Sequence, residues 1–225
     1  MKLFLFDIDG TLLTVNGAGR AAKSLAMREV FGTEGDVNNK PFGGKTDWQI
    51  LSEALENYGF TPEMVGARME EYQRIFAARL YDVIDQYRAD VMPGAYELVA
   101  ELRRRPDAVL GIVTGNTAAT APIKLRVAGF DPDWFPASAY GSEAYSRNDL
   151  PRLALERAIA LCGQFIAPAD VIVIGDTVAD IHCARALGAQ VVAVRTGFEE
   201  TALLAAAAPD VLLDDLTQFW DYVHA

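Results

Sequence analysis

Two aspartates close to the amino terminus have the types and spacing that could do chemistry. Asp7 and Asp9 flank one isoleucine and follow the apolar run Leu3–Phe6. That run has the length and composition of a buried parallel strand, so the carboxylates are expected at its carboxyl end, where α/β proteins bind ligands. Gly10 permits a sharp turn there. The pair suits a hard-metal site or an acid/base pair, and a loop of solvated acids fits this stretch equally well.

Two further apolar runs are expected to be strands that end in polar groups. Ala108–Val113 precedes Thr114, and Val171–Ile174 precedes Asp176, with Asp180 one helical turn further on. Because the carboxyl ends of parallel strands converge on one crevice, these groups should meet the first two aspartates. Four acids in one crevice raise one another's pKa values, and a divalent cation resolves that conflict. A donor set made only of oxygens favours Mg²⁺ over Zn²⁺.

The second of these strand ends also offers donors for an anion. Thr114 supplies a hydroxyl, and Gly115 and Asn116 supply backbone N–H groups at the start of a helix predicted from Thr117 to Ala128. Arg147, in the loop before a later helix, adds a fixed positive charge. A metal, an anion cradle and an unliganded carboxylate together indicate phosphoryl transfer.

The elements that must position these groups fall into two parts. Residues 20–88 have an almost continuous helical pattern with no strand pattern, including a helix capped by Thr46 or Asp47 and a longer helix from Pro62 to about Ile84. From Pro93 onward, strand and helix patterns alternate. The fold class is therefore α/β, a Rossmann-like parallel sheet with helices on both faces, plus an inserted all-helical domain. The predicted domains are residues 1–15 with 90–225, and residues 16–89.

A glycine-rich loop joins the first two inserted helices. It runs from Pro41 to Trp48 and carries Lys45. We interpret it as a substrate-facing loop, with Lys45 and Trp48 as candidate specificity residues at a mouth between domains. An ordinary helix connector with a solvated lysine is the alternative. Gly17 and Gly19 suit a hinge better than a dinucleotide-binding fingerprint, because they do not directly follow the strand.

Composition narrows the class of protein. The formal net charge of −11 argues against a nucleic-acid partner, which needs a basic face. Two cysteines without metal-ligand spacing indicate a reducing compartment, and no apolar run approaches a membrane span, so a cytoplasmic location is expected. His182 and His224 are expected to be structural or surface residues, and Cys183 to be a core residue rather than a nucleophile.

Three segments, DIDGTLL, IVTGN and IGDTVADIHCARALGA, resemble motifs one, two and four of the haloacid dehalogenase-like (HAD) superfamily, in its phosphatase branch. The resemblance covers nearly the whole chain, and the helical block falls where that superfamily inserts its type-one cap. It implies a Mg²⁺-dependent phosphatase acting on a small phosphorylated metabolite through an aspartyl-phosphate. Phosphoglycolate and sugar phosphates are the substrate classes that the resemblance suggests.

The resemblance also implies roles by position. Asp7 would be the nucleophile, and Asp9 would protonate the leaving oxygen and then activate water. Asp7, the backbone carbonyl of Asp9, and Asp176 would hold Mg²⁺, with Asp180 ordering the metal's shell. Thr114, with the amides of the next two residues, would hold the phosphoryl oxygens. A carboxylic acid that donates a proton needs a raised pKa, and the crowded acidic site is expected to raise that of Asp9.

The third motif departs from the family's pattern. It usually contains a lysine followed by proline, and no such pair precedes the helix expected from Leu150. Arg147 is the favoured replacement as a catalytic and phosphate-binding cation, and Lys124 is the competing candidate. Two other functions remain open at this point, a sugar phosphomutase with the same acids and a non-catalytic phosphate-ligand binding protein.

Overall fold

Six parallel strands form the central sheet of the computed structural model, which describes the backbone of residues 1–223. His224 lies outside the described residues. In spatial order the strands are β5 (Ala139–Tyr140), β4 (Ala108–Thr114), β1 (Lys2–Phe6), β6 (Val171–Gly175), β7 (Gln190–Val194) and β8 (Val211–Leu213). The strand order reverses at β1, so the carboxyl ends of β1, β4 and β6 surround the crevice where α/β sheets bind ligands.

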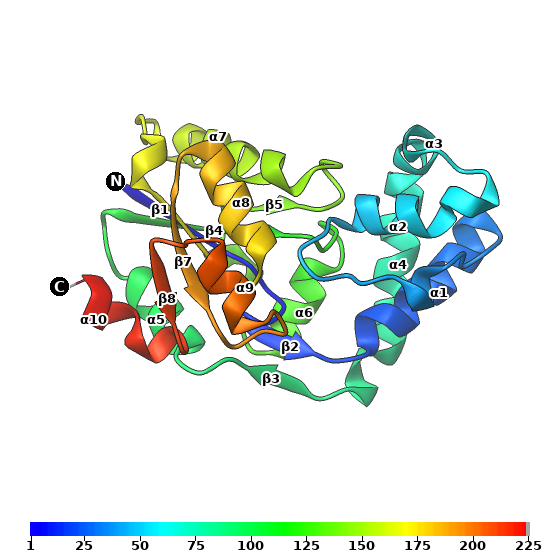
Figure 1. Cartoon of the computed structure of the whole chain (residues 1–225), viewed down its shortest axis with the longest axis horizontal. Helices are drawn as coiled ribbons and strands as arrows, with labels where there is room; N and C mark the ends of the chain where they lie inside the picture. Colours follow the sequence, from blue (N-terminus) through cyan, green and yellow to red (C-terminus); the bar gives the residue numbers. More distant parts are fainter. Residues whose placement is uncertain (224–225) are drawn as a thin grey trace.

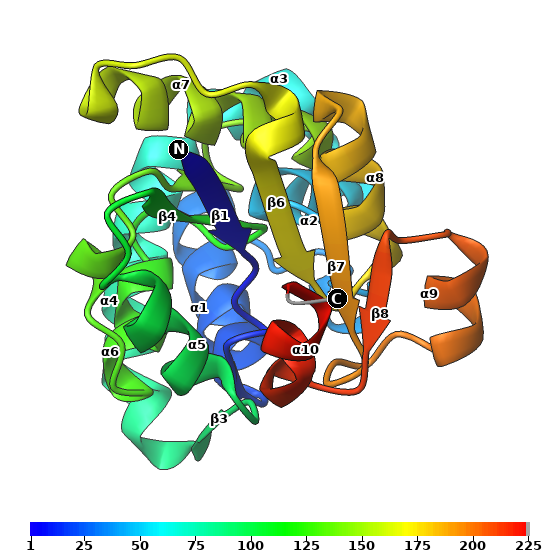
Figure 2. The same cartoon turned by 90° about the vertical axis from the view of Figure 1, so that its left-hand side faces the viewer.

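Helices lie on both faces of the sheet (Figure 2), and alternate residues of β1 pack in opposite layers. Phe4 and Phe6 of β1 belong to one apolar cluster, and Leu3 and Leu5 belong to another. The first cluster includes residues of α5 (Ala95–Leu102), α6 (Ala121–Val127) and α10 (Phe219–Val223), and the second those of α7 (Leu150–Cys162), α8 (Val178–Leu187) and α9 (Thr201–Ala206). The predicted fold class, a parallel sheet covered on both faces, is confirmed.

Helices α1 to α4 lie together on one side of the sheet (Figure 1). They are α1 (Ala18–Phe31), α2 (Asp47–Leu55), α3 (Pro62–Ala67) and α4 (Met69–Val83). The side chain of Thr46 caps α2 by accepting a hydrogen bond from the backbone N–H of Gln49. The single helix predicted from Pro62 is wrong, because the chain breaks between α3 and α4. Gly66 has low helix propensity and packs under the ring of Trp48, which explains the break.

Two short strands connect the helices to the sheet. β2 (Leu13–Val15) and β3 (Ala89–Val91) pair antiparallel, with Leu13 opposite Val91. Figure 1 shows this ribbon where the chain enters and leaves the helical block. Both strands lie outside residues 20–88, where the sequence shows no strand pattern, and neither was predicted, since three residues are too few to show a period of two. No helix in the part of the chain that the structure describes could cross a bilayer.

Candidate active site

The chain turns tightly after β1 and directs two carboxylates to the edge of the sheet. The backbone N–H groups of residues 11–13 all donate to the carbonyl of Ile8. Gly10 has a φ of +91°, and a Cβ atom there would lie 2.5 Å from Oδ2 of Asp176. Only glycine meets both demands, the positive φ and the close approach of another strand's side chain. The turn therefore brings the tip of β1 against the tip of β6.

Three buried carboxylates meet at these tips. Oxygen atoms of Asp7, Asp176 and Asp180 all lie within 4.8 Å of one another. The hydroxyl of Thr11 donates to Oδ1 of Asp176 at 2.9 Å. Oδ2 of Asp180 accepts from the backbone N–H and the hydroxyl of Thr177, at 3.0 and 2.7 Å, and so closes the first turn of α8. Asp176 and Asp180 therefore lie beside Asp7, each held by hydrogen bonds of the fold.

Arg147 reaches the same cluster from a 3-10 turn before α7. Its Nη2 atom lies 3.1 Å from Oδ1 of Asp7 and also donates to Oδ1 of Asp180. The side chain is 6% exposed, and its Nε has no hydrogen-bond partner. One guanidinium thus bridges two of the three carboxylates. Of the two candidates for the third-motif cation, Arg147 is the one that touches Asp7.

The electrostatics of the cluster reflect burial and crowding. Burial raises the pKa of Asp7 to about 6, with Asp180 and Asp9 adding to the effect and Arg147 opposing it. Burial, then the charges of Asp7 and Asp180, raise the pKa of Asp176 well above its ordinary range. Three carboxylates against one guanidinium leave an excess of negative charge.

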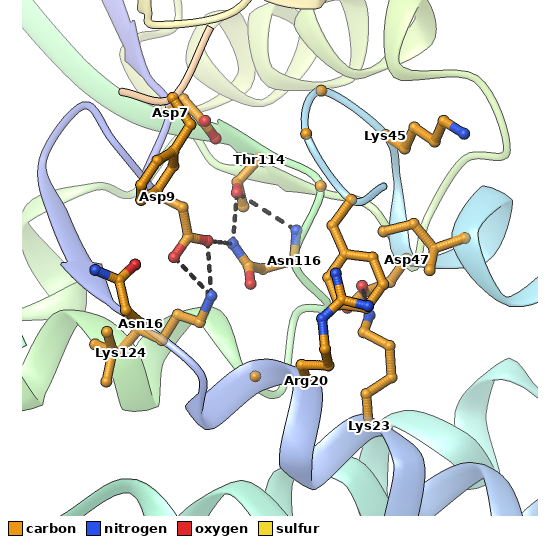
Figure 3. A pocket seen from close by; sticks show the side chains of 18 of the residues that line it. Asp7, Asp9, Asn16, Arg20, Lys23, Lys45, Asp47, Thr114, Asn116 and Lys124 are labelled. Carbon is orange, nitrogen blue, oxygen red and sulfur yellow. Dashed lines mark hydrogen bonds and ion pairs between the residues drawn. The ribbon is translucent and has the colours of Figure 1, made fainter. Parts of the chain in front are cut away.

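Asp9 has a different environment, on the open side of the site. Both of its carboxylate oxygens accept from Nζ of Lys124, at 2.8 and 2.6 Å, and one also accepts from the side-chain amide of Asn116 at 2.8 Å (Figure 3). Burial acts to raise the pKa of Asp9, but the Lys124 charge and these hydrogen bonds outweigh it and lower the pKa. The expectation that crowding raises the pKa of Asp9 is therefore wrong, and the upward shifts fall on Asp7 and Asp176.

The predicted anion cradle follows β4. Thr114 is 1% exposed, and its hydroxyl accepts from the side-chain amide of Asn116 at 2.8 Å. The helix predicted from Thr117 begins later, at Ala121, because residues 117–120 form a hydrogen-bonded turn. Gly115 and Asn116 therefore precede a turn, and their backbone amides do not lie at a helix N-terminus.

The helical block covers these groups and encloses a cavity of about 790 Å³ (Figure 3). Lys45 lines the cavity and pairs with Glu53. Trp48 is not among the cavity-lining residues, since its indole N–H donates to the carbonyl of Pro62 and its ring packs on Gly66. Of the two specificity candidates, only Lys45 lies where a ligand in this cavity could meet it.

Three hydrogen bonds seat the start of α2 on the sheet domain. The backbone N–H of Asp47 donates to the Gly115 carbonyl at 2.7 Å, and that of Trp48 to the Gly141 carbonyl at 3.2 Å. The Thr46 hydroxyl donates to the carbonyl of Tyr145 at 2.8 Å. A Cβ atom at Gly115 would lie 2.0 Å from the carbonyl oxygen of Lys45. The predicted anion cradle at Gly115 and the loop at Lys45 are thus in direct contact.

Several cavity residues were not found by sequence reasoning. Arg20 and Lys23 of α1 and Asp47 of α2 line the cavity from the helical side. Lys23 is only 3% exposed and pairs with Asp47. Its place next to Ala22 and Ala26, both buried in one apolar face, was the available signal, because a lysine on such a face needs a buried partner.

His182 and Cys183, discounted as functional residues, lie on α8. His182 is exposed, whereas Cys183 is buried in the core. Burial raises the pKa of the Cys183 thiol to about 12, so it is not a nucleophile at neutral pH.

The raised pKa of Asp7 predicts a pH-dependent stability in the absence of metal. A carboxyl pKa of about 6 in the folded state, against an ordinary 3.8, means that the unfolded chain loses this proton at lower pH. Asp7 therefore lowers the free energy of unfolding as pH rises from about 4 to 6, by on the order of 3 kcal/mol. We expect Asp7→Asn to gain stability relative to the wild type over this range, measured by urea unfolding with a chelator present. If the difference in unfolding free energy between the two proteins stays constant over this pH range, the pKa of Asp7 is not raised.

The chain is similar to a known protein family and to curated proteins over most of its length. The model of a family described as haloacid dehalogenase-like hydrolase matches residues 4–185. A phosphoglycolate phosphatase from Synechococcus elongatus is 28% identical over 214 residues, which cover 95% of this chain and 93% of that protein. A probable phosphatase, IndB, from Dickeya dadantii is 28% identical over 99% of this chain and 94% of its own length.

Solved structures share the fold over nearly their whole length. A hydrolase from Pseudomonas syringae superposes with a TM-score of 0.70 at 22% identity, covering 100% of this chain and 98% of that one. CbbY from Rhodobacter sphaeroides, in complex with phosphate, gives a TM-score of 0.70 at 17% identity, covering 97% and 96%. At these identities, the structures show the fold alone.

Proposed function

The chain belongs to the haloacid dehalogenase-like hydrolase family, and on this premise we propose that it hydrolyses a small phosphorylated metabolite through an aspartyl-phosphate on Asp7. The family and the phosphatases among its relatives make it a phosphatase. The observation that carries the finer proposal is the position of Asp7. Its carboxylate lines the cavity beside Arg147 and Asp176, and its buried Oδ1 accepts no hydrogen bond.

Mg²⁺ fits the residues present. The cluster offers only oxygen donors, and the raised pKa values of Asp7 and Asp176 mark two carboxylates that lack sufficient positive charge. We propose that these two carboxylates and the backbone carbonyl of Asp9 hold the ion. Asp180 orders the site instead, because both of its oxygens already accept hydrogen bonds, from Arg147 and Thr177. When bound, Mg²⁺ offsets the charge of the carboxylates and of the phosphoryl group.

In the proposed reaction, the carboxylate of Asp7 attacks phosphorus, and the bond from phosphorus to the leaving oxygen breaks. Asp9 gives its proton to that oxygen, then takes a proton from water as the water attacks phosphorus, which releases phosphate and restores Asp7. The Thr114 hydroxyl and the next two backbone amides would hold the phosphoryl oxygens, and Arg147 would balance their charge.

Asp9 must first be protonated, although Lys124 holds its pKa low in this state. The incoming phosphoryl group gives the Lys124 ammonium a second anion to bind. Sharing the lysine weakens its pairing with Asp9, and the pKa of Asp9 then rises toward that of a proton donor.

We also propose that residues 16–89 act as a cap domain that excludes water from the reaction. The three hydrogen bonds from the start of α2 to the sheet domain support a closed position of this cap. Gly17, at the start of α1, has a φ of +93° and suits a hinge beside the β2–β3 ribbon.

We further propose a cytoplasmic location. Cys162 and Cys183 are free thiols, which is typical of proteins in a reducing compartment.

A panel of phosphorylated metabolites, assayed for released phosphate with Mg²⁺ and with excess chelator, tests this function. We expect turnover with Mg²⁺, a fall of at least about a hundredfold with chelator, and recovery when Mg²⁺ is restored. Analysis of the organic product separates hydrolysis from transfer to another hydroxyl of the sugar. If no substrate of a broad panel releases phosphate in a Mg²⁺-dependent way, the alternative of a non-catalytic binding protein replaces this proposal.

A further inference from the structure

Five basic side chains line the cavity, and four of them have an acidic partner. The partnered cations are Lys23 with Asp47, Lys45 with Glu53, Lys124 with Asp9, and Arg147 with Asp7 and Asp180. These charges are balanced before any ligand enters. The fifth cation, Arg20, has no carboxylate within ion-pair distance in the described part of the chain.

Arg20 is nevertheless held firmly. One terminal nitrogen donates to the Val37 carbonyl at 2.6 Å, and the other donates to the Lys40 carbonyl at 3.2 Å. The guanidinium carbon lies 3.8 Å from the centre of the Phe42 ring. Two of the five N–H donors of arginine are used in this way, and three remain. The fold thus fixes an uncompensated positive charge with free donors on the wall of the cavity.

The position of Arg20 sets it apart from the reacting group. Figure 3 shows Arg20 on the helical side of the cavity, with Asp7, Asp9 and Thr114 on the opposite side. In the proposed reaction, the phosphoryl group binds on that opposite side, at Asp7, Thr114 and Arg147. A ligand that spans the cavity would therefore reach Arg20 with its other end.

We propose that Arg20 is a specificity-determining residue that binds a second anionic group, a carboxylate or a second phosphoryl group, on the leaving part of the substrate. This inference rests on the proposed phosphatase function and narrows its substrate to phosphomonoesters with two anionic groups. A guanidinium binds both kinds of anion through paired hydrogen bonds. The net charge of −11 disfavours the approach of anions over long range, so a local unpaired cation is what makes such a substrate acceptable.

The test compares kcat/KM for three probes in the presence of Mg²⁺. Glycerol 1-phosphate has a neutral leaving group, phosphoglycolate has a carboxylate, and 1,3-propanediol bisphosphate has a second phosphoryl group. We expect the wild type to prefer at least one doubly anionic probe over glycerol 1-phosphate. Arg20→Gln should lower that preference ratio by about ten- to a hundredfold, the usual effect of losing a hydrogen bond between charged groups. The probe with the larger loss identifies the second anion.

Arg28→Gln is the matched control, because Arg28 lies on the same helix, outside the cavity lining, and pairs with Glu34 in an exposed position. It should leave the ratio unchanged. Arg20→Lys keeps the positive charge but loses the paired N–H donors of the guanidinium, so it should retain part of the preference for doubly anionic probes. Thermal unfolding of each variant identifies any loss of fold.

The outcomes separate this inference from the function on which it rests. If the wild type hydrolyses glycerol 1-phosphate as well as both doubly anionic probes, or if Arg20→Gln lowers all three equally, the role of Arg20 is refuted and the phosphatase stands. If no probe and no other phosphomonoester is hydrolysed, the proposed function falls, and the inference falls with it.

Discussion

Replacement of Asp7 by asparagine is expected to lower kcat by at least about 10⁴-fold, because the amide cannot form an aspartyl-phosphate. The side chains have nearly the same shape, and Oδ1 of Asp7 accepts no hydrogen bond that the change would break. The variant should therefore fold and still bind substrate. Phosphate release in the presence of Mg²⁺ measures the loss, and circular dichroism checks the fold.

Asp170→Asn provides the matched control for this variant. Asp170 is exposed and directly precedes β6, the strand whose other end leads to Asp176. The same chemical change at the opposite edge of the sheet should leave kcat within about twofold of the wild type. Asp7→Asn activity above about one per cent of the wild-type value would mean that another group attacks phosphorus.

Arg147→Met is expected to affect both folding and activity. Arg147 is 6% exposed, and it is the cation that touches both Asp7 and Asp180. Its removal leaves buried carboxylates without compensation, which costs about 3–5 kcal/mol of unfolding free energy. The pKa of Asp7 should rise further, so less of the nucleophile is ionised at neutral pH, and kcat/KM should fall by about 10²-fold or more. Urea unfolding and steady-state kinetics measure the two effects.

Arg152→Met serves as the comparison, since Arg152 lies on α7 and pairs with Glu156 in an exposed position. Exposed pairs of this kind contribute about 0.5 kcal/mol, so this variant should resemble the wild type. Arg147→Lys should be more stable than Arg147→Met but less stable than the wild type. It keeps the positive charge but loses the planar guanidinium that contacts both carboxylates. Equal stability of Arg147→Met and Arg152→Met would show that Arg147 does not balance the cluster.

The sequence predicted best those features of the fold that depend on a single strand or a single residue. Short apolar runs predicted β1, β4 and β6, and the convergence of parallel strand ends predicted that Asp176 lies beside Asp7. Single-residue chemistry also sufficed for the Thr46 cap of α2. The start of α6 was misjudged because residues 117–120 satisfy their hydrogen bonds in a turn that helical periodicity does not distinguish.

What remained hidden depends on contacts between distant segments. The lowered pKa of Asp9 requires Lys124, 115 residues further along the chain, to reach it from α6. Arg20 has the pattern of a solvated helical cation, and only the packing of α1 places it on the cavity wall. Trp48 was assigned to the mouth of the site because it follows Lys45 closely, whereas its ring packs on Gly66. Proximity in sequence did not determine which way the side chain points.

Chemical trapping of the intermediate tests the central claim, that Asp7 and no other residue takes the phosphoryl group. The enzyme is mixed with Mg²⁺ and a good substrate, quenched during turnover and treated with borohydride, which reduces an acyl phosphate to an alcohol. Peptide mass spectrometry should then find homoserine at position 7 and at no other aspartate, and none without substrate. Rapid turnover with unmodified Asp7, or with the reduced residue elsewhere, would contradict the account.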